Sequence, residues 1–132
     1  MANYPRVLVT DDSQYMRMLL TAMLKRIGFV DIVQADDGSA AIDLLKNEKF
    51  DLVLLDYMMP QTNGLEVLRF IRSQENLADT KVILVTANAD QELVGEALGP
   101  QARVDAIVVK PLSLSTLKSK IEMVLAKRTP VV

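Results

Sequence analysis

Five side chains that could bind a cation or act as a nucleophile stand at the ends of short apolar runs in the sequence. In chain order they are Asp11, Asp12, Asp56, Thr86 and Lys110. The run before Asp56, residues 52–55, is apolar without interruption, as expected for a central strand with both faces buried. In open parallel sheets, functional sites lie in the crevice beyond the carboxyl ends of the strands. Each side chain alone has an ordinary explanation, namely a loop or capping carboxylate, a strand-end hydroxyl or a surface lysine. Their shared placement predicts one site.

Three carboxylates gathered in one site require a counter-charge. At a separation of about 5 Å and an effective dielectric of about 20, two carboxylates repel each other by roughly 3 kcal/mol. Lys110 supplies one positive charge against three acids, and the remaining repulsion would raise their pKa values unless a cation binds. The chain has no cysteine and no histidine, so a metal must be held by oxygen. This chemistry favours Mg²⁺ as the cation that would neutralise the three acids.

Apolar patterns divide the chain into alternating strands and helices. Strands are predicted at residues 6–10, 29–35, 52–55, 81–86 and 104–109. A first helix is predicted between Ser13, as N-cap, and Gly28, and further helices around residues 40–45, 65–71, 88–99 and 114–125. The polar residues 73–76 indicate a loop. Gly95 in the fourth helix costs up to about 1 kcal/mol relative to alanine, so this helix is expected to be short or mobile.

The fivefold alternation of strand and helix predicts an α/β fold with a doubly wound parallel sheet. The second strand is the most polar and is placed at one edge, and the fifth is placed at the other. These placements fit a five-stranded sheet of order 2-1-3-4-5 with five helices, a flavodoxin-like arrangement. We expect residues 1–132 to form a single domain with its core at about residues 6–128 and a frayed tail from Thr129.

Composition excludes several classes of protein. Half of the 132 residues are hydrophobic and 24% are charged, as in ordinary globular domains. The net charge of −2 gives no basis for direct binding of nucleic acid. The N-terminus lacks the apolar core of a signal peptide, and no apolar run approaches the length that spans a bilayer. We therefore expect a cytoplasmic protein without membrane insertion.

Several motifs occur together in the order typical of one family. They are Asp11-Asp12, Asp56 followed by Met59-Pro60 and Gly64, Thr86-Ala87, and Lys110-Pro111. Together they resemble the receiver domain of two-component response regulators, the CheY-like family. The resemblance covers nearly the whole chain, and the complete ordered set is far more specific than any one motif.

The resemblance implies a role for each of these residues. Asp56 would be the phosphoacceptor, Lys110 would pair with the phosphoryl oxygens, and Thr86 would hydrogen-bond one of them. Asp12 and Asp56 would bind Mg²⁺ directly and Asp11 through water, with the backbone carbonyl of Met58 as a further ligand. The resemblance also implies a cis peptide bond between Lys110 and Pro111.

The same resemblance implies a switch with some unusual residues. Phosphorylation would draw Thr86 toward the phosphoryl group and alter the face formed by the fourth helix, fifth strand and fifth helix. Ile107 occupies the position where the family usually carries Tyr or Phe, so coupling to that face is expected to differ or be weak. Met58 and Asn88 flank the phosphoryl position and are expected to tune the lifetime of the phosphorylated state.

The implied partners are a sensor histidine kinase or histidine phosphotransfer protein and a downstream protein target. The chain ends soon after the last predicted helix, so we expect a single-domain regulator, a monomer or weak dimer, and no enzyme beyond its own phosphorylation and dephosphorylation. One alternative is a receiver-like binding module that works without phosphorylation. A haloacid-dehalogenase-type phosphatase is a further alternative, but it would carry a second Asp where this chain has Met58.

Overall fold

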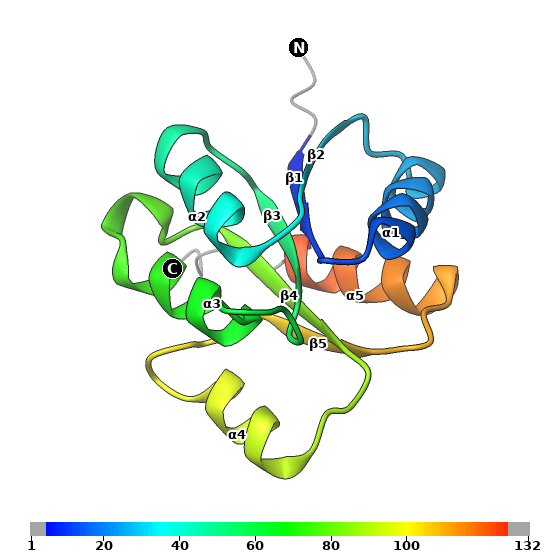
Figure 1. Cartoon of the computed structure of the whole chain (residues 1–132). Helices are drawn as coiled ribbons and strands as arrows, with labels where there is room; N and C mark the ends of the chain where they lie inside the picture. The colour runs from blue at the N-terminus through cyan, green and yellow to red at the C-terminus, as the bar shows by residue number, and fades with distance from the viewer. Residues whose placement is uncertain (1–4, 127–132) are drawn as a thin grey trace, which may run out of the picture.

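A computed structural model describes residues 5–126 of the chain, which form one five-stranded parallel sheet between helices (Figure 1). The strand order is β2-β1-β3-β4-β5, which confirms the predicted order and both edge strands. The strands are β1 (Arg6–Thr10), β2 (Asp31–Ala35), β3 (Leu52–Asp56), β4 (Lys81–Thr86) and β5 (Ala106–Val109). The helices are α1 (Gln14–Ile27), α2 (Gly38–Asn47), α3 (Gly64–Ser73), α4 (Gln91–Leu98) and α5 (Leu114–Ala126), with a 3-10 turn η1 (Glu75–Leu77). The end of the predicted core, residues 127–128, and the predicted tail from Thr129 lie outside the described residues.

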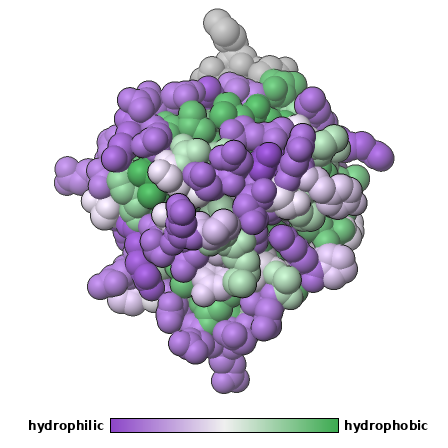
Figure 2. Space-filling view, in the orientation of Figure 1, coloured by the Kyte–Doolittle hydropathy of each residue, from purple (hydrophilic) through white to green (hydrophobic). Residues whose placement is uncertain are grey.

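Side chains on alternate positions of the strands supply two separate cores, because successive residues of a strand point to opposite faces. On one face, Leu8, Val53 and Leu84 pack with apolar residues of α2, α3 and α4. On the other face, Val9 and Leu54 pack with apolar residues of α1 and α5. All five residues of β3 are buried, as predicted for a central strand. The face of the molecule seen in Figure 2 is mostly hydrophilic, with apolar residues exposed between the polar ones.

Two predicted strands begin later than expected. The second begins at Asp31 rather than residue 29, because the N–H of Phe29 still closes the end of α1 by donating to the Leu24 carbonyl at 3.0 Å. Gly28, with φ of 124°, ends α1 as predicted. The fifth begins at Ala106 rather than residue 104, since a carboxylate oxygen of Asp105 accepts the N–H of Val82 at 2.8 Å ahead of the regular ladder.

The segment predicted as a loop after the third helix contains the 3-10 turn η1, which the polar sequence did not indicate. Leu77 is buried in the core below α3 and holds this turn in place. Helix α4 has eight residues, in agreement with the prediction of a short helix. It begins at Gln91, after the N-cap Asp90, rather than at residue 88, and Gly99 is its C-cap. Among the described residues, no helix combines the length and apolar character that crossing a membrane would need.

Candidate functional site

Parallel pairing of β1 with β3 brings the three predicted acids together at the carboxyl edge of the sheet. Thr10 at the end of β1 pairs with Leu55 in β3, so the next residues, Asp11 and Asp56, emerge side by side. One carboxylate oxygen from each of Asp11, Asp12 and Asp56 lies within 4.8 Å of the others. Asp11 and Asp56 are buried, whereas Asp12 is exposed. The predicted acidic cluster is therefore present, with one side open to solvent.

The turn from β1 into α1 fixes the orientation of Asp11. Its N–H donates to the carbonyl of Ala35 in β2 at 3.2 Å, and its Oδ1 accepts the N–H of Ser13 at 2.9 Å. Ser13 caps α1 as predicted, accepting the N–H of Met16 at 3.2 Å. The second oxygen, Asp11 Oδ2, is buried without a hydrogen bond and lies 3.5 Å from Lys110 Nζ. A buried carboxylate oxygen without a hydrogen bond is suited to act as a ligand of a hard cation, which would satisfy it.

A close turn in the β3–α3 loop holds Asp56. Its Oδ1 accepts the N–H of Met58 and the ammonium of Lys110, each at 3.4 Å. Gly64 packs directly behind it, where an added Cβ would lie 2.6 Å from the Asp56 carbonyl oxygen. The N–H of Gly64 also donates to the Tyr57 carbonyl at 3.1 Å. Glycine is required here because no side chain fits between the loop and the end of β3.

The surroundings of Asp56 disfavour its charged form. Burial raises the pKa of the Asp56 carboxyl, and the neighbouring Asp11 carboxylate raises it further. Lys110 and the Met58 N–H act in the opposite direction but do not cancel the rise. A cation bound beside Asp56 would therefore both relieve the repulsion and keep the carboxylate ionised.

Lys110 is placed by the end of β5 and the turn that follows it. Its backbone N–H donates to the Thr86 carbonyl at 2.8 Å, which ties the ends of β4 and β5 together. Its ammonium lies 3.5 Å from Asp11 Oδ2 and 3.4 Å from Asp56 Oδ1, and bridges the two buried acids. The peptide bond to Pro111 is cis, which confirms that prediction.

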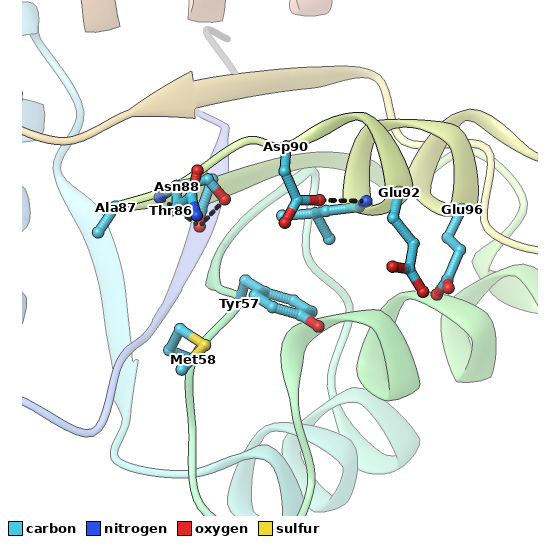
Figure 3. A pocket seen from close by; sticks show the side chains of 9 residues that line it. Tyr57, Met58, Thr86, Ala87, Asn88, Asp90, Glu92 and Glu96 are labelled. Carbon is cyan, nitrogen blue, oxygen red and sulfur yellow. Dashed lines mark hydrogen bonds between the residues drawn. The ribbon is translucent and has the colours of Figure 1, made fainter.

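Thr86 is buried at the end of β4, and its hydroxyl is bonded within its own loop. It donates to the Asn88 carbonyl at 3.1 Å and accepts the Asn88 N–H at 3.2 Å. Beside it opens a cavity of about 390 Å³. In Figure 3, Tyr57 and Met58 lie on one side of this cavity and the β4–α4 segment on the other. Thr86 and Asn88 thus lie at the carboxyl edge of the sheet, where the acids gather, and also line this cavity, into which their loop could move.

The remaining predicted residues lie around this centre. Met58 is 66% exposed, so it extends into solvent from the loop beside Asp56. Ile107 is half-buried in β5 and packs against the core shared with α3 and α4. The predicted roles of Met58, Asn88 and Ile107 remain predictions, because their positions are compatible with them without testing them.

One residue beside the site was not found from the sequence. Arg17, in the first turns of α1, donates from Nη1 to the Asp11 carbonyl at 2.6 Å. An arginine six residues after an aspartate carries no distinctive pattern, and only the closing of the turn onto α1 reveals the contact.

The fold and the site together define a doubly wound α/β protein with an acidic, lysine-bridged site at the switch point of its sheet. The family model of the response regulator receiver domain matches residues 7–122. The chain therefore belongs to the response regulator receiver family, and it is a CheY-like module of two-component signalling.

Individual relatives agree with this assignment. The chain is 37% identical over 119 residues to the chemotaxis protein CheY of Pseudomonas aeruginosa, covering 90% of this chain and 94% of that protein. It is 38% identical over 121 residues to a CheY homologue of Campylobacter jejuni, covering 91% and 92%. Among solved structures, Vibrio cholerae CheY4 superposes with a TM-score of 0.85 at 25% identity, covering 92% of this chain and 99% of that chain. The receiver domain of the P. aeruginosa sensor histidine kinase PA1611, which has a magnesium ion coordinated in its active-site cleft, gives 0.83 at 26% identity and covers 95% and 100%.

Proposed function

We propose that this receiver accepts a phosphoryl group on Asp56 from a phosphohistidine of a sensor kinase or phosphotransfer protein. The observation that carries the proposal is the buried Asp56 carboxylate, which lies beside Asp11 and shares the Lys110 ammonium with it. Asp56 lies 3.4 Å from the Lys110 ammonium, and Met58, two residues further along the β3–α3 loop, is exposed. A phosphoryl donor could therefore approach it from solvent.

Asp11, Asp12 and Asp56 fit a magnesium ion, and the Met58 carbonyl is proposed as a further ligand. The fit is supported by Asp11 Oδ2, which is buried without a hydrogen bond, and by the all-oxygen character of the cluster. When bound, the ion would supply positive charge that neutralises the phosphoryl oxygens.

The proposed transfer needs little covalent machinery. An oxygen of Asp56 attacks phosphorus, the new P–O bond forms, and the P–N bond to the donor histidine breaks. The imidazole leaves with the bonding electron pair and takes a proton from solvent. The Lys110 ammonium, already 3.4 Å from Asp56, would then form an ion pair with the negatively charged phosphoryl oxygens. The chemistry is confined to the protein's own aspartate, so we propose that it turns over no separate substrate besides the phosphodonor.

Phosphorylation is proposed to act on the rest of the domain through Thr86. A phosphoryl group adds about two negative charges and three acceptor oxygens. Its oxygens would compete with the Asn88 carbonyl for the Thr86 hydroxyl, which would free the β4–α4 loop. The cavity between Tyr57 and α4 gives that loop room to shift (Figure 3). The face of α4, β5 and α5 would then change its affinity for a downstream protein, with Ile107 coupling through packing instead of an aromatic ring.

The test is the intact mass of the protein after incubation with Mg²⁺ and acetyl phosphate. We expect a gain of one phosphoryl group that is lost in Asp56→Asn and without Mg²⁺. Asp79→Asn is a matched control, because Asp79 is exposed ahead of β4 at the opposite edge of the sheet. If no adduct formed even with a cognate kinase supplied, the receiver-like module that binds without phosphorylation would become the better account.

A further inference from the structure

Arg17 links three parts of the structure around the acidic cluster. From α1, its Nη1 donates to the Asp11 carbonyl at 2.6 Å, and its Nε donates to Gln34 Oε1 in β2 at 3.3 Å. Gln34 is held in turn, since its Nε2 donates to the Thr21 hydroxyl of α1 at 3.2 Å. The guanidinium therefore joins the helix, the edge strand and the β1–α1 turn that carries two of the acids.

The contact with Arg17 completes the fixing of Asp11. The Asp11 N–H is bonded to Ala35 and its Oδ1 to the Ser13 N–H, so Arg17 restrains the last free backbone atom. Only Oδ2 is left without a hydrogen bond, buried and facing Lys110. The restrained carbonyl also begins the peptide unit that leads to Asp12. One bond from Arg17 thus restrains the peptide unit that joins two of the three acids.

We infer that Arg17 is a positioning residue for cation binding at the acidic cluster, acting through the Asp11 carbonyl and supported by Gln34. This inference rests on the proposed function, in which Asp11, Asp12 and Asp56 hold Mg²⁺. Groups that hold a metal ligand in place typically change metal affinity by roughly 10–100-fold when they are removed.

The sign of the effect separates positioning from simple electrostatics. Arg17 carries a positive charge beside the carboxylates, and that charge by itself repels a divalent cation. If only its charge mattered, Arg17→Ala would bind Mg²⁺ more tightly than the wild type. If Arg17 positions Asp11 and Asp12, the same substitution weakens binding despite the loss of a repelling charge.

The experiment is a titration of the whole chain with MgCl₂ at constant ionic strength, followed by the amide NMR shifts of Asp12 and Met58. We expect Arg17→Ala to raise the Kd for Mg²⁺ by about 10-fold or more. Arg17→Lys is expected to fall between, because one ammonium can reach the carbonyl but lacks the planar fork that also meets Gln34. Arg26→Ala is the matched control, since Arg26 is exposed in the last turn of α1, and it should stay within about twofold of the wild type.

Gln34→Ala provides a second test in case Arg17→Ala does not fold. It leaves the guanidinium in place and removes only its support from β2, so it is expected to weaken Mg²⁺ binding in the same direction by a smaller factor. An unchanged or lower Kd in folded Arg17→Ala, or an unchanged Kd in Gln34→Ala if Arg17→Ala does not fold, would overturn the inference while leaving the proposed function standing. A wild type that shows no saturable Mg²⁺ shifts would overturn both.

Discussion

Replacing Asp56 by asparagine is expected to make the magnesium-free domain more stable while abolishing phosphorylation. Burial and the Asp11 carboxylate raise the pKa of Asp56 in the folded protein, so folding disfavours its charged form. Asparagine keeps the shape of the side chain and removes the charge. Because the folded pKa lies above the unfolded one, the cost of the charged Asp56 is full above the folded pKa. That cost disappears as pH falls through the folded pKa to below the unfolded value of about 3.9.

The magnitude follows from the distances in the cluster. At 4.8 Å, and with an effective dielectric of about 20, each pair of carboxylates repels by about 3.5 kcal/mol. On the same basis, Lys110 at 3.4 Å attracts Asp56 by about 5 kcal/mol. Asp12 is exposed, so solvent screens much of its share, and the charge terms come close to cancelling. The desolvation of Asp56 then decides the sign, and we expect a net gain of about 1–2 kcal/mol for the asparagine variant.

The assay is urea unfolding at pH 7 in EDTA and again in excess Mg²⁺. In a thermal melt, the same gain of 1–2 kcal/mol in unfolding free energy would raise the Tm of a domain of this size by roughly 3–10 °C. Mg²⁺ should stabilise the wild type by mass action and the asparagine variant much less, so the difference narrows or reverses. Asp79→Asn should match the wild type in both conditions.

A lower stability of Asp56→Asn than of the wild type in EDTA at pH 7 would refute this reasoning. It would mean that the attraction between Lys110 and Asp56 exceeds the combined effect of burial and acid–acid repulsion. The reasoning would also be refuted if the advantage of the variant failed to shrink as pH was lowered toward 4, because the cost of the charged Asp56 should diminish as it becomes protonated.

Three further predictions test the scaffold and the switch. Arg72→Ala should lose about 3–5 kcal/mol of unfolding free energy, because its ion pair at 2.7 Å is mostly buried, whereas Arg69→Ala, in an exposed pair at 3.3 Å, should lose less than about 1 kcal/mol. Equal losses in urea unfolding would contradict this. Gly64→Ala should slow phosphorylation by acetyl phosphate at least tenfold, because the added Cβ clashes with the Asp56 carbonyl. Gly95→Ala, which has open space for a Cβ, should instead gain up to about 1 kcal/mol of unfolding free energy. Thr86→Ala should keep a full phosphoryl adduct by mass but lose phosphorylation-dependent partner binding, and unchanged binding would exclude the threonine route.

Regular features of the fold could be predicted from the sequence, because local physics decides them. The uninterrupted apolar run at residues 52–55 requires a strand buried on both faces, and β3 is fully buried. Ser13 begins α1 because its side chain accepts a backbone N–H, and Gly28 ends the same helix because glycine readily adopts a positive φ. Boundaries were less predictable where distant partners set them. Asp105 shortens β5 by bonding the backbone of β4 with its side chain, and no local pattern shows this.

For the candidate site, the sequence by itself determined which side chains gather at the carboxyl edge, because parallel strands deliver the residues that follow them to one edge of the sheet. Tertiary structure alone decided how these groups are bonded. It left Asp11 Oδ2 buried without a hydrogen bond, turned the Thr86 hydroxyl toward Asn88 and brought Arg17 to the Asp11 carbonyl. Each of these contacts depends on how the loops and helices pack around the strand ends. This packing joins residues that are distant in the sequence, so local patterns of residue type and spacing do not reveal it.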